Sequence, residues 1–532
     1  MYRRALLAFA AVAITAAPAT AQSRNLKDRI SDLFTFGSCG EPLCLDGSVN
    51  AGNGHGSHFL GSVAGGNLAV ISFVTDAIAS NASNFPLSSS SSGVTFKFIG
   101  GVPVKSSGSS GPIFGERAQT LGKGRFLMGA NLSGIRFKTL RGVPIDNLTL
   151  NFTHQDVGNP GLGDPDFEND VIQLRLSMFV DLLVSSFFMT YGLLDKVDIG
   201  VAVPLVHTSF QGRSTADIIP FGTPAFHFFG GTSVDPILRA STSTFGSATG
   251  IGDVAARLKI NLANSEHFGM ALLGDARFAT GNEKQLLGAG STSFRAIGAI
   301  SSRFGTFSPH LNAGYLWRGG DLSNAVLANV GFDQALSDWA TIAAEVLSEW
   351  EVGTSKLVLP GPVVYTIPFD RVVNPTEIPN KRDNRMNASI GFKFRAGAPT
   401  IVTNALIPLL RGGLQPNVTW TTGGGVQLLG QPSAISHQPS ADSIEHLAVR
   451  RSRGIDRHPG GGSRLGLTRG ANVSRGFHLL VMGRRMVALP ADGAANERVR
   501  SGVLRGRTHK GPGIFLAPSA ARLLFAIEWC HS

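Results

Sequence analysis

Apolar and polar residues alternate along much of the chain, and the longest example starts at Val171. Every second residue from Ile172 to Val184 is apolar, while most positions between them are polar, with Phe179 and Leu183 as exceptions. Because side chains of a β-strand point alternately to its two faces, this period of two predicts a strand. The segment exceeds the ~10 residues that a barrel strand needs to span a membrane, so we expect it to project beyond the bilayer.

A transmembrane helix fits the same segment poorly. It would bring Arg175 and Asp181 toward lipid, at a cost of about 3 kcal/mol each. A strand of a membrane barrel can instead direct both side chains to a polar interior. We therefore expect Arg175 and Asp181 to face the lumen.

The alternation recurs in shorter segments. In residues 254–262 and 269–278, polar positions fall on the face opposite to the apolar one, and four charged residues there are predicted to face the lumen as well. These four are Arg257, Lys259, Asp275 and Arg277. The other predicted strands are 197–205, 294–304, 309–318, 325–334, 341–352, 384–395 and 418–428.

The connections between these segments differ in length. Short polar turns such as 194–196 and 264–266 alternate with Gly/Ser/Pro-rich connections at 211–250, 279–293 and 353–383. Short turns on one side and long loops on the other are typical of outer-membrane barrels. A soluble β-sandwich or propeller is the alternative, but no 40–50-residue repeat of the propeller kind occurs. The pattern predicts an all-β, antiparallel transmembrane barrel over residues 118–430.

Residues 22–117 have a different pattern. Apolar residues recur at helical spacing in 67–80, and Ser- and Gly-rich runs follow at 88–92 and 106–111. We expect a small plug-like element with one short helix, placed inside the lumen.

Composition supports the barrel and locates the charge. The 532 residues include 66 Gly and 34 Phe, but only 16% are charged, which suits strands between lipid and water. The net charge is +11, yet residues 431–532 hold 15 Lys and Arg against 6 Asp and Glu, and the rest holds 32 against 30. The basic character therefore belongs to the tail, and nucleic acid is not an expected partner of the main body.

The first residues predict export. Arg3 and Arg4 precede an apolar run over 5–14 and the small-residue site Ala19-Thr20-Ala21, as in a cleaved signal peptide of residues 1–21. An uncleaved anchor helix is the alternative. In an oxidising compartment, Cys39 and Cys44 are candidates for a disulfide. Free thiols, or a metal site with His55 and His58, stay open as alternatives, although the His-x-x-His spacing is short.

Sequence motifs of catalysis are missing. Neither a Walker-type phosphate loop, nor a Gly-x-Ser-x-Gly elbow, nor a His-Glu-x-x-His motif occurs. The sequence thus predicts no catalytic residue, no cofactor, no metal and no enzymatic activity.

The segments 190–204 (TYGLLDKVDIGVAVP), 250–259 (GIGDVAARLK), 281–282 (GN) and 288–293 resemble an outer-membrane family annotated with the meta-pathway of phenol degradation. That family is related to the long-chain fatty-acid transporters. The resemblance covers about residues 115–430. It implies a monomeric barrel of about 12–14 strands that admits hydrophobic or aromatic compounds, with a possible N-terminal plug.

These expectations define a function. The chain is predicted to be an outer-membrane channel or transporter of a Gram-negative-type bacterium for hydrophobic or aromatic small molecules, passive or gated by its N-terminal element. Its partners would be outer-membrane lipid and lipopolysaccharide, a hydrophobic substrate and the barrel assembly machinery. A structural or adhesive barrel, or a barrel enzyme acting on lipids, is the alternative.

Residues 431–532 depart from the family pattern, in which the chain ends on a barrel strand. This tail holds 14 of its 15 basic residues as Arg and shows no sustained periodicity. It could be a disordered basic extension, a frame-shifted or read-through translation, or an arm that binds polyanions. We expect it to contribute nothing to the barrel.

Overall fold

The computed structural model describes residues 24–36, 59, 70, 72–81, 96–99, 102–105, 109–156, 162–163, 168–222, 225, 227–320, 323–397 and 399–428. All of them belong to one compact unit, Met1–His437. The signal-peptide segment, Cys39, Cys44 and the tail lie outside the described residues. Within the described part, no helix is long and apolar enough to cross a membrane.

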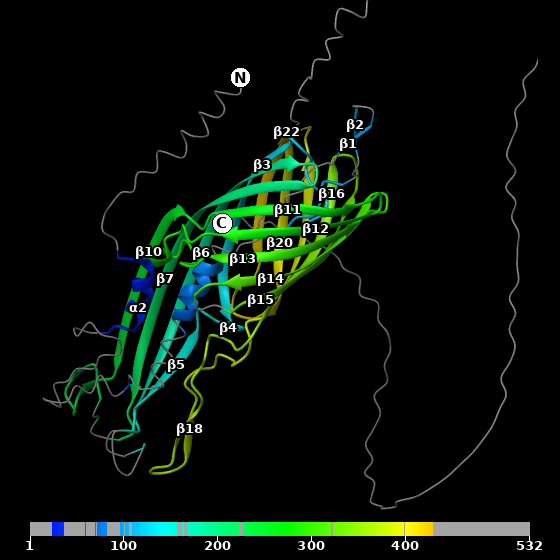
Figure 1. Ribbon diagram of the computed structural model, residues 1–532. Helices are drawn as coiled ribbons and strands as arrows, with labels where there is room; N and C mark the ends of the chain where they lie inside the picture. Colours follow the sequence, from blue (N-terminus) through cyan, green and yellow to red (C-terminus); the bar gives the residue numbers. More distant parts are fainter. Residues whose placement is uncertain are drawn as a thin grey trace, which may run out of the picture. The chain divides into compact units, whose positions relative to one another are not determined.

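Twelve antiparallel strands close into a barrel, because β6 and β7 pair with each other as well as with the two ends of the strand series (Figure 1). In order around the wall they are β7 (Val197–Ile219), β11 (Ala255–Asn264), β12 (Phe268–Arg277), β13 (Ser293–Ser302), β14 (Phe307–Arg318), β15 (Ala325–Ala335), β16 (Ala340–Glu351), β19 (Arg385–Arg395), β20 (Pro399–Arg411), β22 (Thr419–Leu428), β3 (Phe126–Leu140) and β6 (Val171–Leu194). Closure leaves no free edge inside the membrane, as a spanning sheet requires. The predicted fold class is confirmed.

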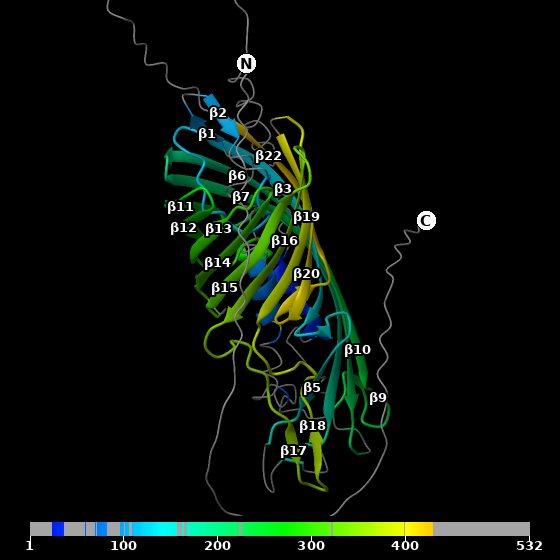
Figure 2. The same ribbon diagram turned by 90° about the vertical axis from the view of Figure 1, so that its right-hand side faces the viewer.

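Two strands are much longer than their neighbours. β6 has 24 residues and β7 has 23, and each changes partners halfway. Near the short turn that joins them they pair with β3 and β11, and farther along they pair with β5 (Leu148–Thr153) and β10 (Arg239–Ile251). The halves of β6 and β7 away from their connecting turn, with β5 and β10, form a four-stranded sheet that continues past the barrel rim on the side of the long loops (Figure 2). We call this sheet the extension.

The extension corrects one prediction about the loops. Residues 211–219 and 239–251, expected within a long connection, are strands. β10 is made mostly of Ser, Thr, Ala and Gly, and its burial alternates only weakly. Small hydroxyl residues form strands readily but leave little apolar pattern in the sequence.

Smaller elements decorate the long-loop side and the N-terminal region. They are α2 (Leu26–Ser31), η1 (Asp32–Phe34), β1 (Phe96–Ile99), β2 (Val102–Lys105), β4 (Val143–Pro144), β8 (Gly230–Gly231), β9 (Pro236–Ile237), η4 (Glu283–Gln285), β17 (Val363–Tyr365), β18 (Arg371–Val373) and β21 (Leu414–Pro416). Residues 72–81 form a further helix, in agreement with the predicted one.

The apolar face of the extension points inward. On β6, every second residue from Ile172 to Val184 is buried in one core with apolar residues of α2, η1 and the 72–81 helix. Two glycines let α2 and η1 approach: a Cβ on Gly212 would lie 2.7 Å from Leu33, and one on Gly246 would lie 2.7 Å from Leu26. The N-terminal helices therefore pack against the inner face of the extension.

This packing reverses the expectation for Arg175 and Asp181. Their side chains are 53% and 44% exposed and lie on the face of β6 opposite to the core. Asp181 forms an ion pair with Arg136, at 2.7 Å, and Arg175 approaches Asp217 at 3.5 Å. The expectation that they face the lumen is wrong, because the N-terminal core occupies the inner side and water is available on the outer side.

Candidate functional site

A chain segment crosses the interior of the barrel near the short-turn end. Residues 109–121 precede the first wall strand, and residues 109–118 are all buried. We call residues 109–121 the inner plug. Its backbone groups have no neighbouring strand, so side chains of the wall satisfy them instead.

Glu345 of β16 is the main anchor of the inner plug. Its carboxylate accepts hydrogen bonds from the backbone N–H groups of Ile113, at 2.6 Å, Phe114, at 3.1 Å, and Gly115, at 2.9 Å. Hydrogen bonds from several N–H groups to one carboxylate are among the strong ones. Gly115 is required here, because a Cβ would lie 2.4 Å from Nε2 of His310.

Other wall residues hold the rest of the inner plug. Asn312 donates to the Glu116 carbonyl and accepts from the Glu116 N–H, both at 2.8 Å. Asp198 accepts from the N–H of Leu121 at 2.9 Å, and Nζ of Lys393 donates to the Pro112 carbonyl. A buried ion pair joins Arg117 to Asp333. The short-turn end of the barrel is thus closed by a segment bonded to many strands.

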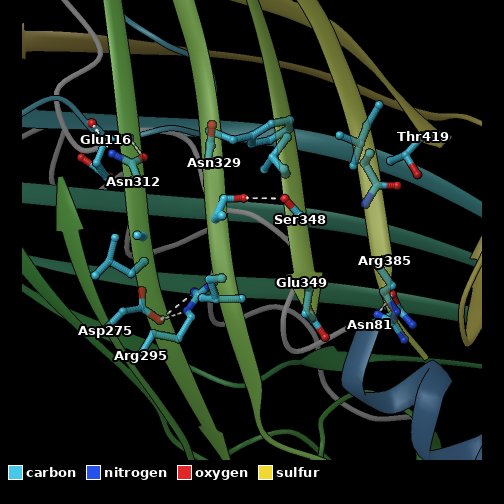
Figure 3. Close-up of a pocket in the computed structure, with 18 of the residues that line it drawn as sticks. Asn81, Glu116, Asp275, Arg295, Asn312, Asn329, Ser348, Glu349, Arg385 and Thr419 are labelled. Carbon is cyan, nitrogen blue, oxygen red and sulfur yellow. Dashed lines mark hydrogen bonds and ion pairs between the residues drawn. The ribbon is translucent and has the colours of Figure 1, made fainter. Parts of the chain in front are cut away.

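A cavity of about 200 Å³ lies within the barrel between the inner plug and the helix at 72–81. Figure 3 shows Glu116 of the inner plug on one side of it and Asn81 of the helix on the other. The wall between them is lined mostly by residues of β3, β11–β16, β19 and β20, with a few from residues 415–419.

Four of the predicted lumen residues lie close together in the interior, and two of them, Arg257 and Asp275, line one edge of this cavity. Arg257, Asp275 and Arg295 are direct cross-strand neighbours on β11, β12 and β13. Both arginines contact the Asp275 carboxylate at 2.7 Å, and Arg277 approaches it at 3.3 Å. Lys259 lies 3.1 Å from the Glu116 carboxylate of the inner plug. The structure places Arg257, Lys259, Asp275 and Arg277 in the interior.

The charged edge continues along β14, β16 and β19. Glu349 is the cross-strand partner of Arg385, accepts a hydrogen bond from Arg318, and also interacts with Arg295. Arg385 in turn donates to the Asn81 amide at 3.4 Å, which connects the edge to the helix (Figure 3). We call the residues Arg257, Lys259, Asp275, Arg277, Arg295, Arg318, Glu349 and Arg385 the charged collar.

Sequence reasoning missed half of the charged collar. Arg295, Arg318, Glu349 and Arg385 all lie in or beside predicted strands, at 294–304, 309–318, 341–352 and 384–395. Their position on the polar face was the available signal.

An apolar belt adjoins the collar. Each of its side chains lines the cavity from a different strand or from the inner plug: Phe114, Ile135, Leu273, Ile297, Leu327, Leu347 and Leu406. Asn329 and Asn387 are cross-strand partners of Leu347 and add amide groups. The cavity is therefore amphipathic, with charges at one edge and an apolar wall next to them.

A second cavity, of about 190 Å³, opens beside the charged collar and is lined by Lys27, Asp76, Glu283 and Arg318. We call it the vestibule. Nζ of Lys27 lies 2.9 Å from Glu283 and 3.4 Å from Asp76, so it joins α2 to η4 and to the helix at 72–81. The hydrogen bond with Glu283 raises the pKa of Lys27 above 10.5, despite partial burial. Because Arg318 lines the vestibule and its partner Glu349 lines the main cavity, their ion pair separates the two spaces.

The candidate disulfide and metal residues Cys39, Cys44, His55 and His58 lie outside the described residues. No group of three His, Cys, Asp or Glu able to hold a metal ion occurs among the described residues. The pairing of Cys39 and Cys44 stays a prediction.

The sequence matches no protein-family model and no curated protein. The solved structures that resemble the chain include outer-membrane channels, the kind of protein that the sequence resemblance indicated. The COG4313 outer membrane channel of Pseudomonas putida F1 has a TM-score of 0.33 and 10% identity, over 58% of this chain and 98% of that one. A FadL homologue of Pseudomonas aeruginosa has a TM-score of 0.26 and 10% identity, over 57% and 88%. The toluene transporter TbuX of Ralstonia pickettii has a TM-score of 0.23 and 11% identity, over 64% and 98%. A link with phenol degradation stays a prediction.

Proposed function

We propose that the chain is an outer-membrane channel for small hydrophobic or aromatic molecules, exported through a cleaved signal peptide. The observation that carries this proposal is the amphipathic cavity inside a closed barrel, because an interior space lined from many strands has no use in a purely structural wall. Exposed apolar residues surround the barrel and suit lipid; among them are Phe187, Val201, Leu258, Leu272, Ile300, Val330, Ile390 and Ile401. This reading favours a transporter over an enzyme.

Transport requires movement of the inner plug, since it closes the short-turn end. Glu345 would control this movement, because its carboxylate accepts hydrogen bonds from three consecutive N–H groups of the inner plug. At the other end, the N-terminal helices and the Lys27 ion pairs restrict access through the vestibule. We propose that both parts of the N-terminal region, residues 22–117, act as a gate.

The proposed function also implies how the protein is assembled and which lipids it contacts. A barrel of this kind would be inserted by the barrel assembly machinery and would function as a monomer. Lipopolysaccharide would contact the outer face of the wall just beyond the lipid-facing apolar residues, where Arg136 and Lys138 of β3 are found.

The test is uptake by Gram-negative cells that lack their own channels for hydrophobic compounds. Cells expressing the full chain should accumulate radiolabelled toluene and benzoate faster than cells with an empty vector, and sucrose should not enter faster. Glu345→Gln keeps one acceptor but removes the charge that holds the plug, so uptake should rise severalfold. Glu266→Gln, on an exposed short turn, is the matched control and should change nothing.

An absence of faster uptake of both toluene and benzoate by folded protein would contradict the channel and favour an adhesive or structural barrel. Hydrolysis of membrane lipid by the purified chain would favour the enzyme alternative.

A further inference from the structure

The charged collar carries an excess of positive charge. Its six cations are accompanied by Asp275 and Glu349 within the collar and by Glu116 of the inner plug. An excess of two positive charges persists even when Asp198, which interacts with Lys259, is counted. Charges in a confined space with apolar walls interact more strongly than they do in water.

Several polar atoms at the cavity are buried without a hydrogen-bond partner. Nε of Arg385 and the amide oxygen of Asn329 are among them, and Nε of Arg318 is buried without a partner beside the vestibule. A buried donor without a partner costs ~1–3 kcal/mol, so a ligand in the cavity that accepts from Arg385 would relieve that cost. Both guanidinium groups interact with Glu349, Arg385 as its cross-strand partner on β19 and Arg318 from β14, two strands away.

The apolar belt defines the rest of the ligand. Leu273, Ile297, Leu327 and Leu347 border the collar directly, since Leu273, Ile297 and Leu327 fall in the same cross-strand row as Glu349 and Arg385. A dry apolar cavity of about 150 Å³ accommodates benzene. The cavity of about 200 Å³ therefore has room for one ring with a small charged group.

We propose that this cavity binds small carboxylates with a monocyclic apolar body, the carboxylate toward Arg295 and Arg385 and the ring against the apolar belt. This inference rests on the proposed channel function and narrows its substrate class. A neutral hydrocarbon would leave the donors of the collar without acceptors, whereas a carboxylate accepts bidentate hydrogen bonds from arginine. An amine of the same shape would be repelled.

The experiment is equilibrium dialysis of the full chain, folded in detergent, against benzoate, benzyl alcohol and benzylamine. Benzoate should bind at least tenfold more tightly than benzyl alcohol, a difference of ~1.4 kcal/mol, and benzylamine more weakly than both. Arg295→Gln should lower the affinity for benzoate about tenfold and leave that for benzyl alcohol unchanged. Arg213→Gln, an exposed arginine on the outer face of β7, is the control and should have no effect.

Arg385→Gln gives an independent variant in case Arg295→Gln does not fold, and heat-modifiable migration on gels verifies closure of each barrel. Equal binding of benzoate and benzyl alcohol, or an unchanged benzoate affinity in a folded collar variant, would overturn the inference. If the unaltered chain transports toluene but shows no preference for benzoate, the channel stands and only the substrate class is wrong. Benzoate binding without any uptake would instead reject the channel function.

Discussion

The barrel wall and the extension present opposite faces to the interior. From β11 to β19 many inward residues are charged or amide-bearing, as at Lys259 and Glu345, with the apolar belt among them, and the outward residues are apolar, as at Leu272. In the extension the inward residues are apolar, as at Leu174, and the outward ones are polar, as at Arg175. The same single layer of strands is thus polar inside in one region and apolar inside in the other.

Three strands reverse along their length: β6 and β7, which enter the extension, and β3, which pairs with β6. On β3 the inner residues change from Asn131 and Ser133 to Ile135 and Phe137, while the outer ones change from Leu132 to Arg136. On β6 and β7 the reversal lies near the cross-strand pair of Ser185 and Leu205. The outer face of a membrane barrel is apolar where lipid covers it and polar where water does, so we infer that this line marks the membrane edge on the side of the long loops.

The largest effect should follow from a charge placed on the inner face of the extension. Leu174 is fully buried, and Leu174→Asp would bury a carboxylate without a partner, at a cost of about 4 kcal/mol. Ser177→Asp, on the outer face and opposite Arg213, should be neutral. Protease protection of the N-terminal helices is the measurement. Equal protection in the two variants would mean that these helices do not pack there.

The sequence predicts most strands well, and its errors lie mainly where the polar and apolar faces exchange along a strand. A period of two separates two faces but does not say which medium each one meets, so Arg175 and Asp181 were assigned to the wrong side. β3 was missed entirely, because its apolar residues change faces at Gly134 and no continuous alternation survives. β20 was missed as well, and two prolines within it weaken its strand pattern.

The interior charges were easier to predict than their arrangement. Strands away from the reversal line keep their charged residues on one face, so Arg257, Lys259, Asp275 and Arg277 were assigned from alternation alone. The convergence of Arg385 with Glu349, and of Glu345 with the inner plug, depends on ring closure and on strand register, which alternation does not specify.

A second substitution probes the outer face of the barrel wall. Leu272 is half exposed in the middle of β12, and Leu272→Arg should cost about 2–4 kcal/mol in a bilayer. Gln211→Arg, on the outer face of the extension, should cost nothing, because water covers that face. Urea titration of the folded protein in liposomes measures both. A comparable loss of stability in Gln211→Arg would mean that the membrane reaches beyond the pair of Ser185 and Leu205 toward the long loops.

Removal of a buried charge in the barrel interior should have a moderate effect. Lys259→Met leaves the Glu116 carboxylate with one cation fewer, and we expect a loss of about 2 kcal/mol because Arg257 still lies 3.5 Å away. Adding Glu116→Gln should restore part of the stability, since it removes the buried charge that lost its partner. Thermal midpoints of heat-modifiable migration give the comparison. Additive losses in the double variant would show that the two groups do not interact.

The smallest effect concerns the ion pairs by which Lys27 joins α2 to η4 and to the helix at 72–81. The pKa of Lys27 is raised above 10.5, chiefly by its hydrogen bond with Glu283, so the charged form is favoured when α2 is docked. A raised pKa stabilises docking fully below pH 10.5, and this contribution disappears as the pH rises through the folded-state value. The Lys27 side chain is 36% exposed, so solvent screening keeps the contribution small.

Hydrogen exchange of residues 26–34 in detergent at pH 8 and pH 11, corrected for intrinsic rates, should therefore reveal a modest loss of protection at the higher pH. In Lys27→Gln the additional loss should vanish, whereas Lys196→Gln, in the exposed turn between β6 and β7, should behave like the unaltered chain. Strands β12 to β16 should keep their protection throughout, because their hydrogen bonds do not depend on this lysine. If they lose protection together with α2, the extension and the barrel open as one unit.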